Sequence, residues 1–269
     1  MNRKSRDSNN QSESRYNIRA LDRAFRVLSL LSEGQPLTLL ELSEGIDLST
    51  STTFRLMATL LFHRYVKRDD QTNQFSLGLA CLELSRAYYE SDNLRSTALP
   101  VLESLRDDIK ETVHLVVMDQ MEIIYLEKIP GLHAIGLMSS RVGKRAPSYC
   151  TGVGKVLLAY EESQAVDNYF ETHSMQRFTN TTITTIKALQ EELKEVRRQG
   201  FAVDRGEHEA EVWCVAAPIF NLNGQAIAAL SISGPEGRMA PLDENCELVQ
   251  KAKKASMTIS TELGFIPNR

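Results

Sequence analysis

Three short stretches of the sequence carry side chains that could do chemistry, and the first spans residues 49–55. It reads STSTTFR and places five hydroxyls ahead of one arginine. Hydroxyls bond phosphate oxygens, and an arginine fork fits the major-groove edge of guanine. At the start of a helix this pattern predicts contact with double-stranded DNA, although it is equally typical of the polar beginning of an ordinary surface helix.

The second stretch is the glycine turn TGVGK, residues 151–155. A phosphate-binding P-loop would need glycine where Tyr149 stands and serine or threonine where Val156 stands, so that reading is excluded. Two readings remain open. The free amides of a helix N-terminus could bind an anionic group, or the glycines could allow close packing against a sheet.

The third stretch combines Cys214, in the apolar run VWCVAAP, with the polar loop DRGEHEAE at 204–211. A thiol in an apolar strand is usually core, and a nucleophile would need a neighbouring base to lower its pKa. The loop could supply a base, ligate a metal or simply be solvated. One histidine among carboxylates has no recognised metal spacing, so we predict no metal site.

Two serines, Ser231 and Ser233, alternate out of the run AIAALSISG onto one strand face. Facing inward beside Cys214, they would suit recognition of a small polar ligand. Facing outward, they would be ordinary surface hydroxyls.

The elements that position the first stretch form a compact N-terminal module. A T-x-x-E capping box at Thr38 and Glu41 begins one helix, and Ser49 can cap the next. Apolar residues at helical spacing predict the buried faces. For the first helix these are Ile18, Leu21, Phe25, Leu28 and Leu31, and for the helix after Ser49 they are Phe54, Met57, Leu60 and Leu61.

Two β-like runs around residues 69–73 predict a hairpin, with Lys67 and Arg68 on one strand. Three helices and this basic wing make a winged helix-turn-helix. Winged helices also serve as protein-interaction modules, so the fold alone does not settle the partner. The predicted DNA-contacting residues are Thr38, Ser49, Thr50, Ser51, Thr52, Thr53, Arg55, Lys67 and Arg68.

The charge distribution favours the same end of the chain. The net charge is -4, but residues 1–80 hold 11 basic and 9 acidic residues, a balance of +2. The remaining residues hold 20 basic and 26 acidic residues, a balance of -6. A small basic module on an acidic body is compatible with DNA binding.

The rest of the sequence predicts an α+β body around an antiparallel sheet. An apolar helix at 78–91 would join the two parts and pack on a dimer partner. Asn223-Gly224 predicts a hairpin turn. We expect strands at 112–118, 122–129, 133–138, 201–204, 212–220 and 226–233, and helices at 94–109, 154–160, 162–170, 187–199 and 243–263.

Composition excludes several classes of protein. No apolar run approaches the roughly 18 residues of a membrane helix, and the polar residues 1–16 lack the apolar core of a secretory signal. Four dispersed cysteines argue against a disulfide framework. We therefore expect a cytoplasmic protein with a disordered N-terminal arm, no cofactor and no membrane partner.

Taken together, the motifs resemble the IclR family of bacterial transcriptional regulators over residues 17–266. The matching runs are ALDRAFRVLSLL, LTLLELSEGIDLSTSTTFRLMATL, FSLG, ETVHLVV, IIYLEKI, RVGKRAPSYCTGVGKVLLA, CVAAPIFNLNG and ALSISGP. The resemblance implies a winged helix-turn-helix at 17–78, a linker helix at 79–92 and a GAF-like α/β effector domain at 93–267. It also implies homodimers, often paired into tetramers, on palindromic operators, with small metabolites as effectors.

Carried over by position, the family's effector pocket comprises Met138, Thr151, Gly152, Val153, Gly154, Asp204, Val212, Cys214, Ser231 and Ser233. Relatives often have Glu-Glu shortly after the Asp204 position and Gly before the cysteine. Here Gly206-Glu207 and Trp213 stand there, which leaves the effector's identity open.

The expected function is therefore a DNA-binding regulator, a repressor rather than an activator, with no catalytic residues. A small carboxylate or sugar acid would control its operator binding. Two rival hypotheses are a cysteine-dependent enzyme, using Cys214 with His208 or Asp204, and a winged-helix interaction protein without a ligand.

Overall fold

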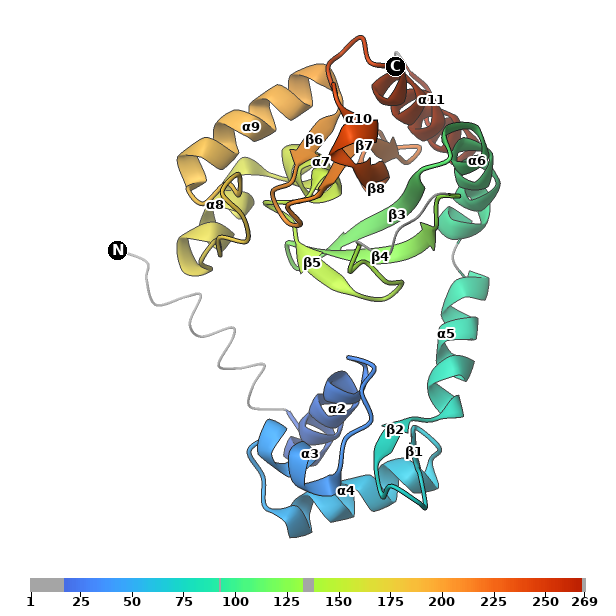
Figure 1. Ribbon diagram of the computed structural model, residues 1–269, viewed down its shortest axis with the longest axis vertical. Coiled ribbons are helices and arrows are strands. Elements are labelled where there is room, and N and C mark those ends of the chain that lie inside the picture. The colour runs from blue at the N-terminus through green and yellow to red at the C-terminus, as the bar shows by residue number, and fades with distance from the viewer. Residues whose placement is uncertain (1–16, 92, 133–137, 268–269) are drawn as a thin grey trace. The chain divides into compact units, whose positions relative to one another are not determined.

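The computed structural model describes residues 17–91, 93–132 and 138–267 and divides the chain into two compact units, 1–91 and 92–269 (Figure 1). The first unit contains α2 (Arg19–Leu31), α3 (Leu39–Gly45), α4 (Thr50–Phe62), β1 (Val66–Arg68), β2 (Phe75–Leu77) and α5 (Leu79–Ser91). The second contains α6 (Asn93–Ile109), β3 (Thr112–Asp119), β4 (Glu122–Ile129), β5 (Arg145–Pro147), α7 (Gly152–Tyr160), α8 (Ser163–Thr172), α9 (Ile186–Gln199), β6 (Ala202–Arg205), β7 (Val212–Phe220), β8 (Ala226–Pro235), α10 (Glu236–Met239) and α11 (Glu247–Glu262).

The first unit is a winged helix-turn-helix. Helices α2, α3 and α4 surround an apolar cluster, and β1 pairs with β2 as the antiparallel wing. The turn of the wing is held by Asp69, whose Oδ1 accepts hydrogen bonds from the amides of Gln71 and Thr72 at 2.9 and 2.8 Å. The predicted hairpin is confirmed.

The predicted inner face of the first helix is partly wrong. The predicted Leu31 is buried together with Val27, and the predicted Leu28 packs on the same cluster, whereas Ile18, Leu21 and Phe25 are exposed. The helix has two apolar rows, and both satisfy a 3.6-residue period. Periodicity cannot tell which row faces the core, so the exposed row remains available to another chain.

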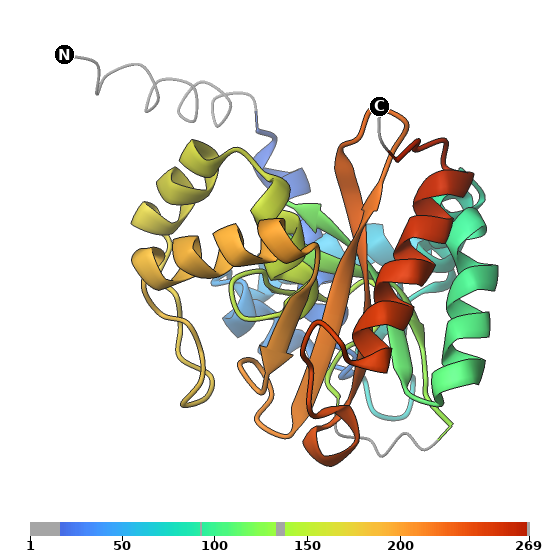
Figure 2. The ribbon, with the colours of Figure 1, turned by 90° about the horizontal axis from the view of Figure 1, so that it is seen from above.

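The second unit is built on a six-stranded antiparallel sheet of order β5-β4-β3-β8-β7-β6. Figure 2 shows α6 and α11 on one face of this sheet and α7, α8 and α9 on the other. The predicted hairpin between β7 and β8 is confirmed, because Asn221 Oδ1 accepts from the amides of Asn223 and Gln225 while Gly224 adopts a positive φ of 75°. The α+β fold expected from the sequence is confirmed.

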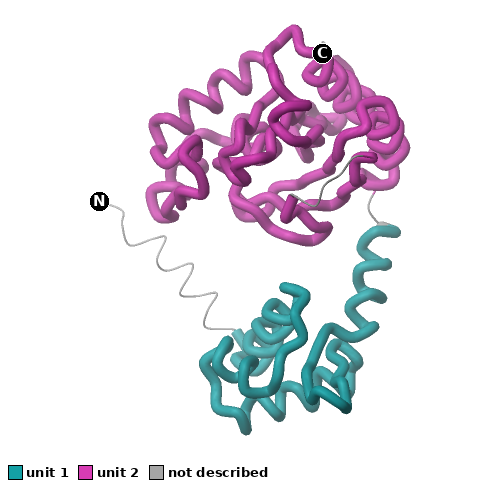
Figure 3. Tube along the Cα trace, in the orientation of Figure 1, with its two compact units in different colours: residues 1–91 teal, residues 92–269 magenta. Residues whose placement is uncertain are grey.

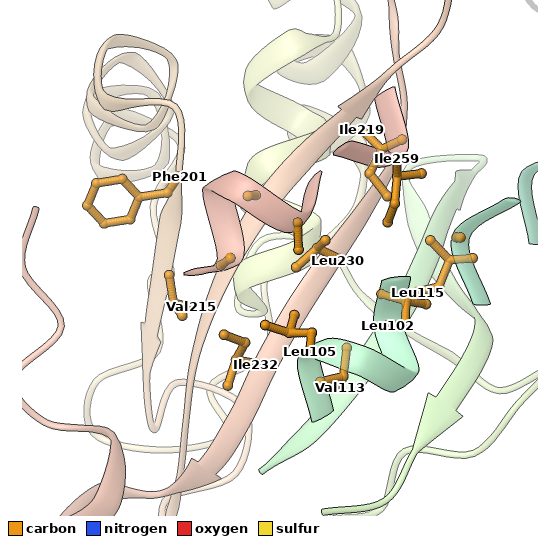
Figure 4. Close-up of a cluster of buried hydrophobic side chains, with 14 of the residues drawn as sticks. Leu102, Leu105, Val113, Leu115, Phe201, Val215, Ile219, Leu230, Ile232 and Ile259 are labelled. Carbon is orange, nitrogen blue, oxygen red and sulfur yellow. The ribbon is translucent and has the colours of Figure 1, made fainter. Parts of the chain in front are cut away.

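Side-chain alternation along the strands separates two cores. On one face of the sheet, apolar side chains form a cluster with α6 and α11; among them are Val113, Leu115, Val215, Leu230 and Ile232. Figure 4 shows part of this cluster. The other face carries small residues, including Ala216 and Ala229, beneath α7. Small residues there let α7 approach the sheet closely, which matters for the site described below.

The division between the units falls at the end of α5, as Figure 3 shows, so this helix belongs to the first unit. Two sequence expectations concern other parts of the chain. The disordered arm at 1–16, and the strand at 133–138 apart from Met138, lie outside the described residues. Within the described ranges, no helix is long and apolar enough to cross a membrane.

Candidate functional site

The turn before α3 contains the predicted capping box. The Glu41 amide donates to Thr38 Oγ1 at 3.3 Å, while Glu41 Oε2 accepts from the Thr38 amide at 2.7 Å. The same carboxylate accepts from the Thr38 hydroxyl at 2.7 Å. These bonds lower the pKa of Glu41, with the Thr38 amide as the main cause. The Thr38 hydroxyl is therefore engaged within its own helix.

The hydroxyls at the start of α4 also bond to one another. Ser49 Oγ accepts from the Thr52 amide at 3.4 Å, which makes Ser49 the predicted cap. It also lies 2.9 Å from Thr52 Oγ1 and 3.2 Å from Ser51 Oγ. This network holds the first turn of α4 in shape and occupies much of its hydrogen-bonding capacity.

Two assignments on α4 are corrected by the structure. Thr53 was expected on the DNA side, but it is fully buried and its hydroxyl donates to the Ser49 carbonyl at 3.2 Å. Phe54 was expected in the buried stripe, but 58% of it is exposed. Thr53 faces the core together with the predicted Met57 and Leu60. Its burial is tolerated because a threonine can satisfy its hydroxyl on the preceding turn.

The exposed side of α4 is chemically suited to nucleic acid. Thr50, Ser51 and Arg55 are exposed there, and the helix contains no acidic residue. On the wing, Lys67 and Arg68 are exposed. Arg68 donates to the Asn73 side chain, and its guanidinium lies 6.0 Å from the Phe75 ring centre, so its position is fixed on the hairpin.

The second unit encloses a cavity of about 40 Å³ on the α7 side of the sheet. It is lined by His114, Tyr125, Met138, Ser140, Thr151, Val153, Asp204, His208, Glu209, Val212, Cys214, Ser231 and Ser233. Eight of the ten residues predicted for the effector pocket are among them: Met138, Thr151, Val153, Asp204, Val212, Cys214, Ser231 and Ser233.

Strand register explains why residues so distant in sequence meet at this cavity. Asp204 on β6 stands opposite Cys214 on β7, which stands opposite Ser233 on β8. On the other side of β8, Ser231 stands opposite His114 of β3. Side chains in register on adjacent strands project from the same face, so one row of polar groups crosses four strands.

His114 organises one wall of the cavity. Its Nδ1 lies 3.2 Å from Ser231 Oγ and 3.4 Å from Ser233 Oγ, and its Nε2 lies 3.0 Å from Ser140 Oγ. Burial and, to a smaller extent, nearby Lys128 lower the pKa of His114 to about 3. The imidazole is therefore neutral at physiological pH and presents one donor and one acceptor among three hydroxyls.

Asp204 and Cys214 continue the same row of polar groups and make that end of the cavity weakly acidic. Burial raises the pKa of Asp204 to about 7, although the hydrogen bond from the Glu207 amide at 2.7 Å opposes the shift. Burial also raises the pKa of Cys214, and Asp204, whose Oδ2 lies 3.9 Å from its sulfur, raises it further. Cys214 is therefore a neutral thiol, which is the unreactive form.

The glycine turn allows close packing, which is one of the two roles left open by the sequence, while binding of an anion by its amides stays a prediction. Thr151 caps α7 by accepting from the Gly154 amide at 3.3 Å, and Thr151 and Val153 line the cavity. Gly152 and Gly154 do not line it. A Cβ on Gly152 would lie 3.0 Å from Cys214 Sγ, and one on Gly154 would lie 2.2 Å from the Ser148 carbonyl oxygen. These two glycines allow α7 to pack closely, which brings its N-terminus to the cavity.

A buried cation holds the loop at one side of the cavity. Lys155 Nζ donates to Glu207 Oε1 at 2.5 Å, to Glu192 Oε1 at 2.8 Å and to the Val203 carbonyl at 2.6 Å. Burial lowers the pKa of Lys155, but the two carboxylates outweigh burial and the net shift is upward. The lysine is therefore charged, and it ties α7 to the loop that carries His208 and Glu209.

The same loop is fastened from its other side. Glu209 Oε1 accepts from the Ser139 amide at 2.9 Å, and Thr182 Oγ1 donates to the Glu207 carbonyl at 2.6 Å. Trp213, one of the departures from the family pattern, packs against the α6 and α11 core on the opposite face of the sheet. It therefore does not narrow the cavity.

The cavity also contains residues that the sequence reasoning missed or left undecided. His114, Tyr125 and Ser140 were not predicted, while Glu209 was considered as a member of a polar loop and His208 also as a possible base for Cys214. The run TVHLVV contained a signal for His114. Alternation along a strand places His114 on the same face as Val116, which is an inward residue. Nothing in the sequence indicated Ser140, which reaches the cavity from outside any regular element.

Comparison with known proteins gives consistent matches over both units. Residues 86–261 match the bacterial transcriptional regulator IclR C-terminal domain, and residues 20–70 match the IclR helix-turn-helix domain. The HTH-type transcriptional regulator KdgR of Escherichia coli (strain K12) is 35% identical over 244 residues, covering 90% of this chain and 92% of that protein. The HTH-type transcriptional repressor AllR of Klebsiella pneumoniae is 29% identical over 98% of this chain and 97% of its own length.

Among solved structures, an IclR homologue from Microbacterium hydrocarbonoxydans complexed with 4-hydroxybenzoate has a TM-score of 0.80. It is 26% identical and covers 91% of this chain and 98% of its own.

Proposed function

Because the chain belongs to the IclR family of bacterial transcriptional regulators, we propose that a small carboxylate bound in the C-terminal cavity controls the affinity of the protein for a palindromic operator. The protein is a DNA-binding transcriptional regulator that responds to a metabolite. We assign it as a repressor, in line with relatives such as AllR that are named repressors. The effector acts by binding two conformations of the protein with different affinity.

The observation that carries this proposal is the composition of the cavity wall. Neutral hydrogen-bonding groups, namely His114, Ser231 and Ser233, form one side. The N-terminus of α7 and an aspartic acid whose pKa lies near neutrality also line the cavity. Helix amides and a protonated carboxyl favour a carboxylate, while the hydroxyl wall favours further oxygen atoms. A sugar acid or a hydroxy or keto acid has both features.

The comparisons support this choice of ligand class. The neighbouring structure from Microbacterium hydrocarbonoxydans holds 4-hydroxybenzoate, which pairs a carboxylate with a hydroxyl.

We place the DNA contacts on the exposed start of α4 and on the wing. Arg55 reads base edges, while Thr50, Ser51, Lys67 and Arg68 contact the backbone. Thr38, Ser49 and Thr52 contribute by holding the turns in shape, given the hydrogen bonds they make locally. The DNA lies in the cytoplasm, and we place the protein there.

A homodimer is the form that fits this function, because two helix-turn-helix units read the two halves of a palindrome. Two exposed apolar rows in the first unit support it. One consists of Ile18, Leu21 and Phe25 beside and on α2, and the other contains Leu79 and Leu82 on α5. Such rows are typical of surfaces that a second subunit covers. Tetramers would form by pairing two dimers.

A regulator fits the cavity chemistry better than a cysteine-dependent enzyme. Catalysis by Cys214 would need a thiolate, and its surroundings raise the thiol pKa instead. We therefore assign Cys214 to ligand contact, and we assign no catalytic residue.

The proposal is tested with a panel of small acids against the full chain. Sugar acids, keto acids and hydroxy acids are screened by thermal shift, with the matching neutral sugars and alcohols as controls. An effector should raise the unfolding temperature of the wild type, and Ser233→Val should reduce that rise because it places a methyl group where the hydroxyl lies.

The acid found in this way should also change operator affinity in a gel shift. If no acid shifts the unfolding temperature, or if the acid that does leaves DNA binding unchanged, the proposed control by this cavity is refuted.

A further inference from the structure

Fewer side chains on the surface of α4 are available to contact bases than its sequence predicted. Ser49 and Thr52 bond each other at the cap, and Thr53 is buried. Ser51 Oγ also lies 3.2 Å from Ser49 Oγ. The side chains left on the exposed first two turns are therefore Thr50, Phe54 and Arg55.

Phe54 stands out because its ring is 58% exposed and is not part of the apolar cluster beneath α4. It lies three residues after Ser51 and directly before Arg55. Residues three and four apart share one side of a helix, and Ser51, Phe54, Arg55 and Ala58 are all exposed. An exposed aromatic ring thus lies between the polar side chains of Ser51 and Arg55 on the first two turns of α4.

The chemistry of the major groove supplies a partner for such a ring. Thymine is the base that presents a methyl group there, and phenylalanine is among the side chains that contact this methyl. An adjacent arginine pairs with guanine through O6 and N7. We infer that Phe54 contacts the 5-methyl group of a thymine that neighbours the guanine read by Arg55. The inference rests on the proposed function and adds a specificity-determining residue to it.

The charge around Phe54 favours DNA over a protein partner. Helix α4 has no acidic residue, and Arg55, Lys67 and Arg68 are exposed on α4 and the wing. Exposed basic side chains and an aromatic ring at the start of α4 match a duplex whose groove edge carries methyl groups.

The expected size of the effect follows from burying one methyl group. Removing that group from the DNA should weaken binding about fourfold in each half-site, equivalent to about 0.8 kcal/mol. A palindrome with both half-sites altered should lose about fifteenfold.

The experiment first selects the operator from a random duplex library with the full-length wild-type chain. Each thymine of the half-site is then replaced by deoxyuridine, which differs only by lacking the methyl group, and affinities are measured at one fixed salt concentration. One thymine next to the Arg55-dependent guanine should show the fourfold loss. The Phe54→Ala variant should bind the thymine and uracil operators equally, and Phe54→Leu should retain part of the difference.

Phe62→Ala is the matched control. Phe62 is the last residue of α4 and is 82% exposed, so its removal should leave the fourfold difference intact. Far-UV circular dichroism confirms that each variant is folded.

The inference is overturned if uracil binds as well as thymine throughout the half-site, or if Phe54→Ala retains the wild-type difference. A protein surface as the partner of Phe54 would give the first of these results. If the selection enriches no sequence at all, the proposed DNA-binding function has failed instead, so the two failures are distinguishable.

Discussion

Replacing Lys155 by methionine should lower the unfolding free energy of the second unit by about 4 kcal/mol at pH 7. Lys155 is 1% exposed, and its ammonium group lies 2.5 Å from Glu207 Oε1. Methionine keeps most of the volume but removes the charge and leaves Glu207, which is 6% exposed, without its cation. Breaking a buried ion pair by removing one partner typically costs about 3 to 5 kcal/mol.

The magnitude has an upper limit because Glu207 can take up a proton. Burial already raises the pKa of Glu207, and pairing with Lys155 opposes that rise. Protonating a glutamate with an ordinary pKa of about 4.3 costs about 1.4 kcal/mol for each pH unit above that value. The cost is therefore about 4 kcal/mol at pH 7 and about 1 kcal/mol at pH 5.

The sign of the pH dependence follows from the two states of the variant. Above pH 4.3 the unfolded chain releases the Glu207 proton, whereas the folded variant keeps it. The folded variant therefore loses stability relative to the wild type as pH rises. The deficit should grow by about 3 kcal/mol between pH 5 and pH 7.

Urea unfolding followed by tryptophan fluorescence measures this deficit. Trp213 is the single tryptophan of the chain and packs against the core of the second unit, so its emission reports that unit. Lys194→Met is the matched control. Lys194 pairs with Glu191 at 3.0 Å on the surface, with 72% of its side chain exposed, and its loss should change stability by less than about 0.5 kcal/mol.

Two results would refute this reasoning. One is a Lys155→Met deficit that is the same at pH 5 and pH 7, since proton uptake by Glu207 then plays no part. The other is a Lys155→Met/Glu207→Gln double variant that is no more stable at pH 7 than Lys155→Met alone.

Three further predictions concern the cap, the DNA surface and the cavity. Thr38→Ala should lower the stability of the first unit by about 1 kcal/mol by removing the capping box of α3. An unfolding free energy equal to that of the wild type, from thermal or urea unfolding, would contradict the role of the cap. Arg55→Ala should weaken specific operator binding by about 1 to 3 kcal/mol in a gel shift at fixed salt, and unchanged affinity would exclude it as a base reader. Binding of a carboxylate effector should fall about tenfold from pH 6 to pH 8, because Asp204, with a pKa of about 7, loses its proton and repels the ligand. Asp204→Asn should remove this dependence in calorimetric titrations, and a persistent pH effect would assign it to another group.

Local features were predictable because they depend on neighbouring residues alone. The capping box at Thr38 and the cap at Ser49 involve atoms three residues apart, and the wing and the β7–β8 hairpin depend on short turns. The apolar strand 212–220 was predicted with the bounds that β7 has in the structure.

The errors occurred where a helix offers two faces that sequence alone ranks equally. Helix α2 buries Val27 and leaves Phe25 exposed, and α4 buries Thr53 and leaves Phe54 exposed. Which face turns inward depends on the neighbouring helices. On α4 the predicted Met57 and Leu60 are buried and Leu61 packs against the same cluster, so only Phe54 at the edge of the predicted stripe lies on the surface.

The sequence by itself determined the class of this protein, its two units, its local turns and, through the family resemblance, most of the cavity lining. The tertiary structure alone decided which residues meet. Strand register aligned Asp204, Cys214 and Ser233 and added His114 to the same wall. The side chain of Lys155 was brought to Glu207 by the packing of α7 on the sheet. Such contacts depend on the arrangement of several elements at once, and burial then sets the protonation of the groups that meet, which no local pattern encodes.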